Sequence, residues 1–66
     1  MAVYKKIELV GTSSESLEDA IRTAIKKASE TLRNLDWFEV KEIRGKINGD
    51  DVQTFQVVLT VGFKID

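Results

Sequence analysis

The chain lacks cysteine and histidine altogether, with no copy of either among its 66 residues. Without cysteine it can form neither a disulfide nor a thiolate zinc site. Without histidine it has neither the commonest general base nor the usual pH-dependent switch. A domain of this length buries only about 60% of the surface that its unfolded chain exposes, so it is marginal by itself. Oligomerisation is therefore the expected source of additional stability.

The sequence also lacks a large excess of charge and a long apolar run. Its 10 basic and 11 acidic residues give a net charge of -1, which provides no basic footprint for nucleic acid or an anionic membrane. No apolar run approaches the roughly 20 residues of a membrane span, and the N-terminus lacks the apolar stretch of a signal peptide. We expect a single cytoplasmic domain over residues 1–66, without nucleic-acid or membrane partners.

Hydrophobic periodicity predicts a strand followed by a helix in the first half of the chain. Alternating apolar residues indicate a strand over Val3–Val10, which the Gly11–Ser14 segment should end. A helical apolar period then predicts a helix from Ser16 to about Asn34. Ser16 is a suitable N-cap, and Arg33 would lie in the last turn, where the helix dipole favours a cation.

Two further strands and a hairpin are predicted in the second half. The first runs over Asp36–Ile47, and a shift in its apolar alternation indicates a bulge or bend near Lys41-Glu42. The second runs over Val52–Ile65 with strict alternation. Between them, Asn48–Asp51 contains the Asn-Gly pair that favours a type I′ turn.

These elements predict an α+β fold with the order β-α-β-β. A crossover helix followed by a hairpin gives a three-stranded antiparallel sheet in which the third strand is central, so the strand order is 1-3-2. The helix is expected to cover the sheet face formed by alternate residues of the last strand: Phe55, Val57, Leu59, Val61, Phe63 and Ile65. The opposite face should stay open, with Tyr4, Val10 and Val58 on it.

Two residues on the open face are candidates for ligand binding. Phe38 and Val40 should point toward the helix, so Trp37 points away from it, and Gln56 also has the parity of the open face. An indole can stack on a flat heterocycle, and an amide can donate and accept hydrogen bonds at its edge. The alternative interpretation is that Trp37 fills a subunit interface and Gln56 is an ordinary surface residue.

No residue pattern predicts catalysis or a metal site. Glu39 and Glu42 are interpreted as solvated strand charges, because their spacing alone does not make an acid–base pair. Asp50 and Asp51 are explained better by a turn than by a bound cation. We therefore expect a protein that is not an enzyme.

The sequence resembles the dodecin family over essentially its whole length. The Leu35–Val40 segment, Leu-Asp-Trp-Phe-Glu-Val, and the Gln56–Phe63 segment are the most specific parts of the match. The matching stretches are Val3–Ser13, Glu18–Ile21, Leu32–Val40, Glu42–Gly45 and Phe55–Lys64.

The resemblance implies a hollow homododecamer that stores and protects flavins (FMN, riboflavin or lumichrome). In dodecins, flavins lie in pockets at subunit interfaces, stacked between symmetry-related tryptophans, and a glutamine hydrogen-bonds the pyrimidine edge of the ring. Trp37 and Gln56 match these two positions. The only partners that the resemblance implies are further copies of the chain and the flavin.

The resemblance also implies an alternative ligand, coenzyme A, which some bacterial dodecins bind. Arginines near the positions of Arg44 and Lys64 meet phosphate groups in those proteins. Arg44 matches, whereas Lys64 departs from the more common arginine and lacks the bidentate fork suited to phosphate. An inter-subunit salt bridge is an equally good explanation for both residues. Three alternatives to flavin storage therefore stay open. The first is a shell that binds coenzyme A or a metal, with flavin secondary, and the second is a purely structural shell. The third is a flavoenzyme, for which no residue set orients a second substrate.

Overall fold

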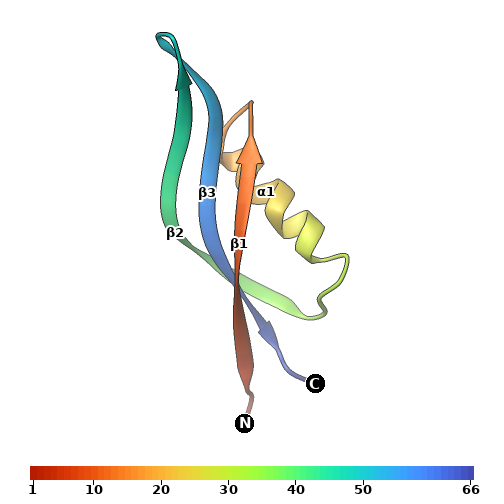
Figure 1. The fold of residues 1–66 in the computed structure, drawn as a ribbon. Helices are drawn as coiled ribbons and strands as arrows, with labels where there is room; N and C mark the ends of the chain where they lie inside the picture. The colour runs from red at the N-terminus through yellow and green to blue at the C-terminus, as the bar shows by residue number, and fades with distance from the viewer.

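The computed structural model describes all of residues 1–66 and has four elements in the predicted order. Strands β1, β3 and β2 form one antiparallel sheet with β3 in the centre, which confirms the predicted topology. The termini lie at one end of the elongated molecule and the β2–β3 hairpin at the other (Figure 1). The bounds are Tyr4–Ser13 for β1, Leu17–Ala28 for α1, Leu35–Asn48 for β2 and Asp51–Lys64 for β3.

Strand β1 continues through the residues that were expected to end it. Gly11 pairs with Val57 inside the ladder and is buried, and an added Cβ there would lie 2.9 Å from the Cβ of Ala24 in α1. The glycine therefore allows the helix to approach the sheet closely, and it is not a strand breaker. Ser13 ends the strand and ties it to the helix, because its hydroxyl donates to Asp19 Oδ2 at 2.7 Å.

Helix α1 begins as predicted and ends earlier than predicted. The Ser16 side chain accepts a hydrogen bond from the Asp19 backbone N–H at 3.0 Å, which confirms it as the N-cap. The helix stops at Ala28, and Asn34, with φ of 63°, lies in the loop that leads to β2. The predicted end near Asn34 and the placement of Arg33 in the last turn were therefore wrong. α1 is neither long nor apolar enough to cross a membrane.

The β2–β3 hairpin has the predicted position and a different turn type. Asn48 pairs with Asp51, so Gly49 and Asp50 form the loop. Only Gly49 has a positive φ, of 68°, which is the pattern of a type II′ turn, in which glycine is the first central residue, and not of type I′. The register also shifts between Val40 and Glu42, which confirms the predicted bulge at Lys41.

The core is small because α1 covers only part of one sheet face. The helix packs against β1 and β3, and none of its Cα atoms comes within 8 Å of a Cα atom of β2 (Figure 1). The expectation that it covers the whole apolar face was therefore too broad. The core residues are Ala20, Ala24, Val57, Leu59 and Val61. Large side chains on the uncovered part of β2 stay exposed: Phe38, Val40, Ile43 and Ile47.

Candidate functional site

The open sheet face carries an indole that lies flat on the central strand. Trp37 neighbours Gly62 of β3, and a Cβ at position 62 would overlap the six-membered ring of the indole. The absence of a side chain at Gly62 therefore lets the ring rest on the strand backbone. The Tyr4 ring of β1 lies beside the indole, with 5.2 Å between ring centroids and a tilt of 57°. Trp37 stays 39% exposed, so part of the ring is available for stacking.

Gln56 lies in a polar concavity toward the hairpin end of the same face. It pairs with Thr12 of β1 and with Arg44 of β2, so the three side chains form one row across the sheet. The concavity measures about 370 Å³ and contains no hydrophobic and no acidic residue. Its lining residues are Thr12, Arg44, Gly45, Lys46, Gln53, Thr54 and Gln56.

Trp37 and Gln56 share a face but not a site within one chain. Trp37 neighbours Gly62, and residues 56 to 62 of β3 are six steps apart. At a rise of about 3.3 Å per residue, six steps span roughly 20 Å. Lys64 lies on the tryptophan side, paired with Tyr4, whereas Arg44 lies beside Gln56. The four candidate residues therefore form two groups, Trp37 with Lys64 and Gln56 with Arg44.

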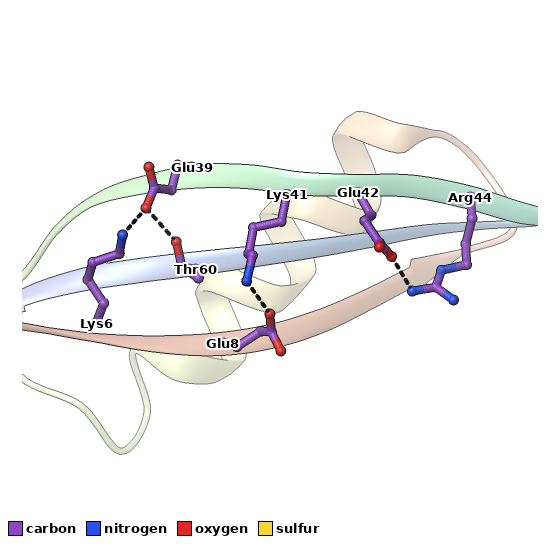
Figure 2. A network of polar contacts seen from close by, with 7 residues as sticks. All are labelled: Lys6, Glu8, Glu39, Lys41, Glu42, Arg44 and Thr60. Atoms are coloured by element: carbon purple, nitrogen blue, oxygen red, sulfur yellow. Dashed lines mark hydrogen bonds and ion pairs between the residues drawn. The ribbon is translucent and has the colours of Figure 1, made fainter.

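A stripe of ion pairs occupies the sheet between the two groups (Figure 2). Lys6 of β1 reaches across β3 to Glu39 of β2. One step further, Lys41 Nζ lies 3.1 Å from Glu8 Oε2. The bulge at Lys41 places it and Glu42 on the same face as Glu39, so each can form an ion pair there (Figure 2).

Glu39 is a carboxylate in this stripe whose pKa is lowered by its neighbours. The Lys6 ammonium hydrogen-bonds its side chain, and Thr60 Oγ1 donates to Oε1 at 3.0 Å. These two hydrogen bonds, together with the nearby positive charge of Lys6, lower the pKa of Glu39 below its usual range. The carboxylate is consequently held in its charged form, as befits a structural ion pair.

Arg44 is held by a neighbouring acid. Its Nη2 lies 2.5 Å from Glu42 Oε1, two residues earlier on β2. The charge of the guanidinium is therefore partly balanced before any ligand arrives. Both side chains are more than half exposed, so the pair is weak and another anion can compete for the arginine.

Three contributors to this face were not singled out from the sequence. Strand alternation placed Tyr4 on the open face, but its contact with the indole depends on the register across three strands. The alternation also placed Gly62 there, but an isolated glycine in a strand does not reveal which side chain covers it. Lys46 has the parity of Arg44, which could have identified it as a second cation near Gln56. No three His, Cys, Asp or Glu side chains converge within the chain in a way that could hold a metal ion.

The chain is similar to known proteins over almost its whole length. The family model described as Dodecin matches residues 3–66. The chain is 62% identical over 64 residues to the dodecin of Thermus thermophilus, which covers 97% of this chain and 93% of that protein. It is 31% identical over 65 residues to a Mycobacterium tuberculosis protein named calcium dodecin, covering 98% and 92% of the two chains. The crystal structure of an arginine-to-alanine variant of the T. thermophilus dodecin superposes with a TM-score of 0.96 at 59% identity, covering 100% and 98% of the two chains.

Proposed function

The chain belongs to the dodecin family, and from that premise we propose that it stores a flavin in a site completed by a second copy of the chain. The ligand is FMN or a related flavin such as riboflavin or lumichrome. The isoalloxazine ring stacks on Trp37 of one copy, and Gln56 of another copy hydrogen-bonds its pyrimidine edge. The assembly is the hollow homododecamer that the family resemblance implies, and the protein sequesters its ligand without turning over a substrate.

The distance between Trp37 and Gln56 is the observation that carries this proposal. An isoalloxazine ring is about 10 Å long, whereas the two residues lie roughly 20 Å apart along β3 in one chain. One ring cannot stack on the indole and reach the amide of the same copy. Two copies that place the Trp37 end of one sheet beside the Gln56 end of another resolve this difficulty.

The exposed apolar surface supports assembly of several copies. Only seven hydrophobic residues are buried in one chain, and three of them are alanines. Phe38, Val40, Ile43 and Ile47 of β2 remain between 40% and 78% exposed. A soluble monomer rarely leaves such a row of large apolar side chains in water, and contacts between copies would bury it.

The chemistry of the two groups suits a flavin. The indole rests on Gly62 and against Tyr4, so its orientation is fixed before a ligand binds. The Gln56 amide can donate and accept at once, which matches the alternating donors and acceptors of the flavin pyrimidine ring. The carboxylates on this face are engaged in ion pairs with lysine or arginine, and this arrangement favours storage over acid–base catalysis.

Titration of FMN with the purified protein, followed by flavin emission, tests the proposal. We expect strong quenching that saturates near one flavin per chain, together with a native mass near that of twelve subunits. Trp37→Ala should weaken binding by about tenfold or more, since it removes both the stacking energy and the contact area. Trp37→Phe keeps an aromatic ring and should retain part of the affinity. Unchanged flavin emission at micromolar protein would exclude flavin storage and favour a structural shell.

A second candidate ligand is coenzyme A, which the polar concavity beside Gln56 favours. Arg44 and Lys46 line this concavity without an acidic neighbour in its wall, and phosphate groups are suitable anions for such a site. Competition between coenzyme A and FMN separates the two candidates. Displacement of FMN would indicate a shared phosphate site, whereas simultaneous binding would indicate separate sites.

A further inference from the structure

Five cations point to the open sheet face, and the structure divides them by their partners. Lys6, Lys41 and Arg44 each form an ion pair with a glutamate of the same face. Lys46 and Lys64 form no ion pair within the chain, so their charges are available to a ligand or to another copy. The two free lysines lie at opposite ends of the sheet, because Lys46 pairs with Thr54 and Lys64 pairs with Tyr4.

Lys46 is the free lysine that shares the concavity with Gln56. Arg44 and Lys46 are alternate residues of β2, so both point to the open face, and both line the concavity. The remaining walls offer hydroxyl and amide groups, from Thr12, Thr54 and Gln53, which can donate to phosphate oxygens. No carboxylate in the wall opposes an anion.

We propose that this concavity is an anion site in which Lys46, together with Arg44, binds the phosphate of a phosphorylated ligand. This proposal rests on the proposed function in one respect: the phosphate that binds in the concavity is the phosphate of FMN. Lys46 thereby acts as a specificity residue that favours FMN over riboflavin, which has the same ring and ribityl chain but no phosphate.

The ion pair between Arg44 and Glu42 explains why Lys46 is important for binding a phosphate. An incoming phosphate must compete with Glu42 for the guanidinium, which is 2.5 Å from that carboxylate. The Lys46 ammonium has no such competitor within the chain, so a phosphate gains a full opposite charge there. Its long flexible side chain can also follow the phosphate without a change in the strand.

The test compares FMN with riboflavin in the assembled protein and in two lysine variants. Lys46→Gln should weaken FMN binding by about fivefold and riboflavin binding by less than about twofold, the size expected for one charge-assisted contact in a solvated site. Lys26→Gln is the matched control, because it removes a lysine of α1 that also forms no ion pair within the chain and does not lie on the open sheet face. The control should leave the ratio of FMN affinity to riboflavin affinity at the value of the unmodified protein. The advantage of FMN should also shrink at high salt.

A second measurement does not depend on flavin binding. Pyrophosphate should shift the backbone amide resonances of residues 44–46 and 53–56 in the unmodified protein, and these shifts should be largely lost in Lys46→Gln. An unchanged ratio of FMN to riboflavin affinity in Lys46→Gln, or an equal fall of that ratio in Lys26→Gln, would overturn the role of Lys46. If no flavin binds the unmodified protein, the proposed function fails, and the pyrophosphate shifts alone decide whether the anion site exists.

Discussion

Gly62→Ala tests the indole platform without touching the tryptophan itself. An added Cβ at position 62 overlaps Cε2, Cζ2 and Cη2 of Trp37. The strand backbone of β3 is central and paired on both sides, so it cannot move away. The indole must therefore lift off the sheet, and its contact with Tyr4, now at 5.2 Å between ring centroids, is lost or weakened.

The expected losses of stability and of flavin affinity in Gly62→Ala depend on the partial exposure of the Trp37 indole. Overpacking in a closed core costs about 1–3 kcal/mol, but an indole that is 39% exposed can turn outward. We therefore expect the lower end of that range, about 1 kcal/mol, in stability. The larger effect should be on flavin binding. A misaligned stack forfeits about 0.5–1.5 kcal/mol beyond its area, and the upper value corresponds to about a tenfold loss of affinity.

Flavin fluorescence titration and thermal unfolding measure the two effects on the same samples. Gly49→Ala is the control: its φ of 68° makes alanine unfavourable, nothing lies within 4 Å of the added Cβ, and the residue is in the distant hairpin loop. It should lower stability by about 1 kcal/mol and leave flavin affinity unchanged. Trp37→Phe should make the added methyl group at position 62 less costly, because the smaller ring relieves the overlap. Full flavin affinity in Gly62→Ala would refute the assignment of Gly62 as the support of the indole.

Two further predictions concern stability. Ser16→Ala removes the hydroxyl that accepts a hydrogen bond from the Asp19 backbone N–H at 3.0 Å. The substitution should destabilise the protein by about 1 kcal/mol, which thermal unfolding would show as a lower midpoint. An unchanged midpoint would mean that assembly, and not the cap, fixes the start of α1. Lys6 and Thr60 lower the pKa of Glu39 in the folded protein. The charged carboxylate therefore contributes its full stability above the pKa of an unfolded glutamate, about 4.3. This stability is lost as the pH falls through the lower pKa of the folded state. Below about pH 4.5, the free energy of unfolding should therefore depend less steeply on pH in Glu39→Gln than in the unmodified protein. Denaturant titrations at several pH values measure this dependence. An identical slope in both proteins would exclude the Glu39 ion pair as the source of the pH dependence.

Strand parity made much of the fold and of the site predictable. The uninterrupted alternation of β3 identified its apolar face. Its central position followed from the crossover helix and the hairpin, which together make β3 antiparallel to both of the other strands. The break in the alternation of β2 located the bulge at Lys41. Parity also placed Trp37 and Gln56 on one face, as the register has them.

The alternation of side chains could not predict how far apart two residues lie along a strand, or which strands the helix covers. The apolar period continues to Leu32 and Leu35, yet α1 ends at Ala28, because the chain must turn at Asn34 to enter β2. Gly11 was read as a breaker because close approach to Ala24 depends on the packed helix. That β2 stays uncovered follows from the length and direction of α1, and neither is encoded in the alternation of β2 itself.

The uncovered strand and the divided site have one physical origin. The helix lies over β1 and β3, so most of the large apolar side chains of β2 stay exposed. On the opposite face of the sheet, β2 carries Trp37 toward one end and Arg44 toward the other. Any arrangement of copies that buries β2 also decides which residues meet across copies. In the proposed function, a ligand that bridges Trp37 of one copy and Gln56 of another binds the assembly and not the separated chain. By mass action such a ligand stabilises the assembly in proportion to the logarithm of its concentration over its dissociation constant. Storage of the ligand and stability of the shell are then two measures of the same binding free energy.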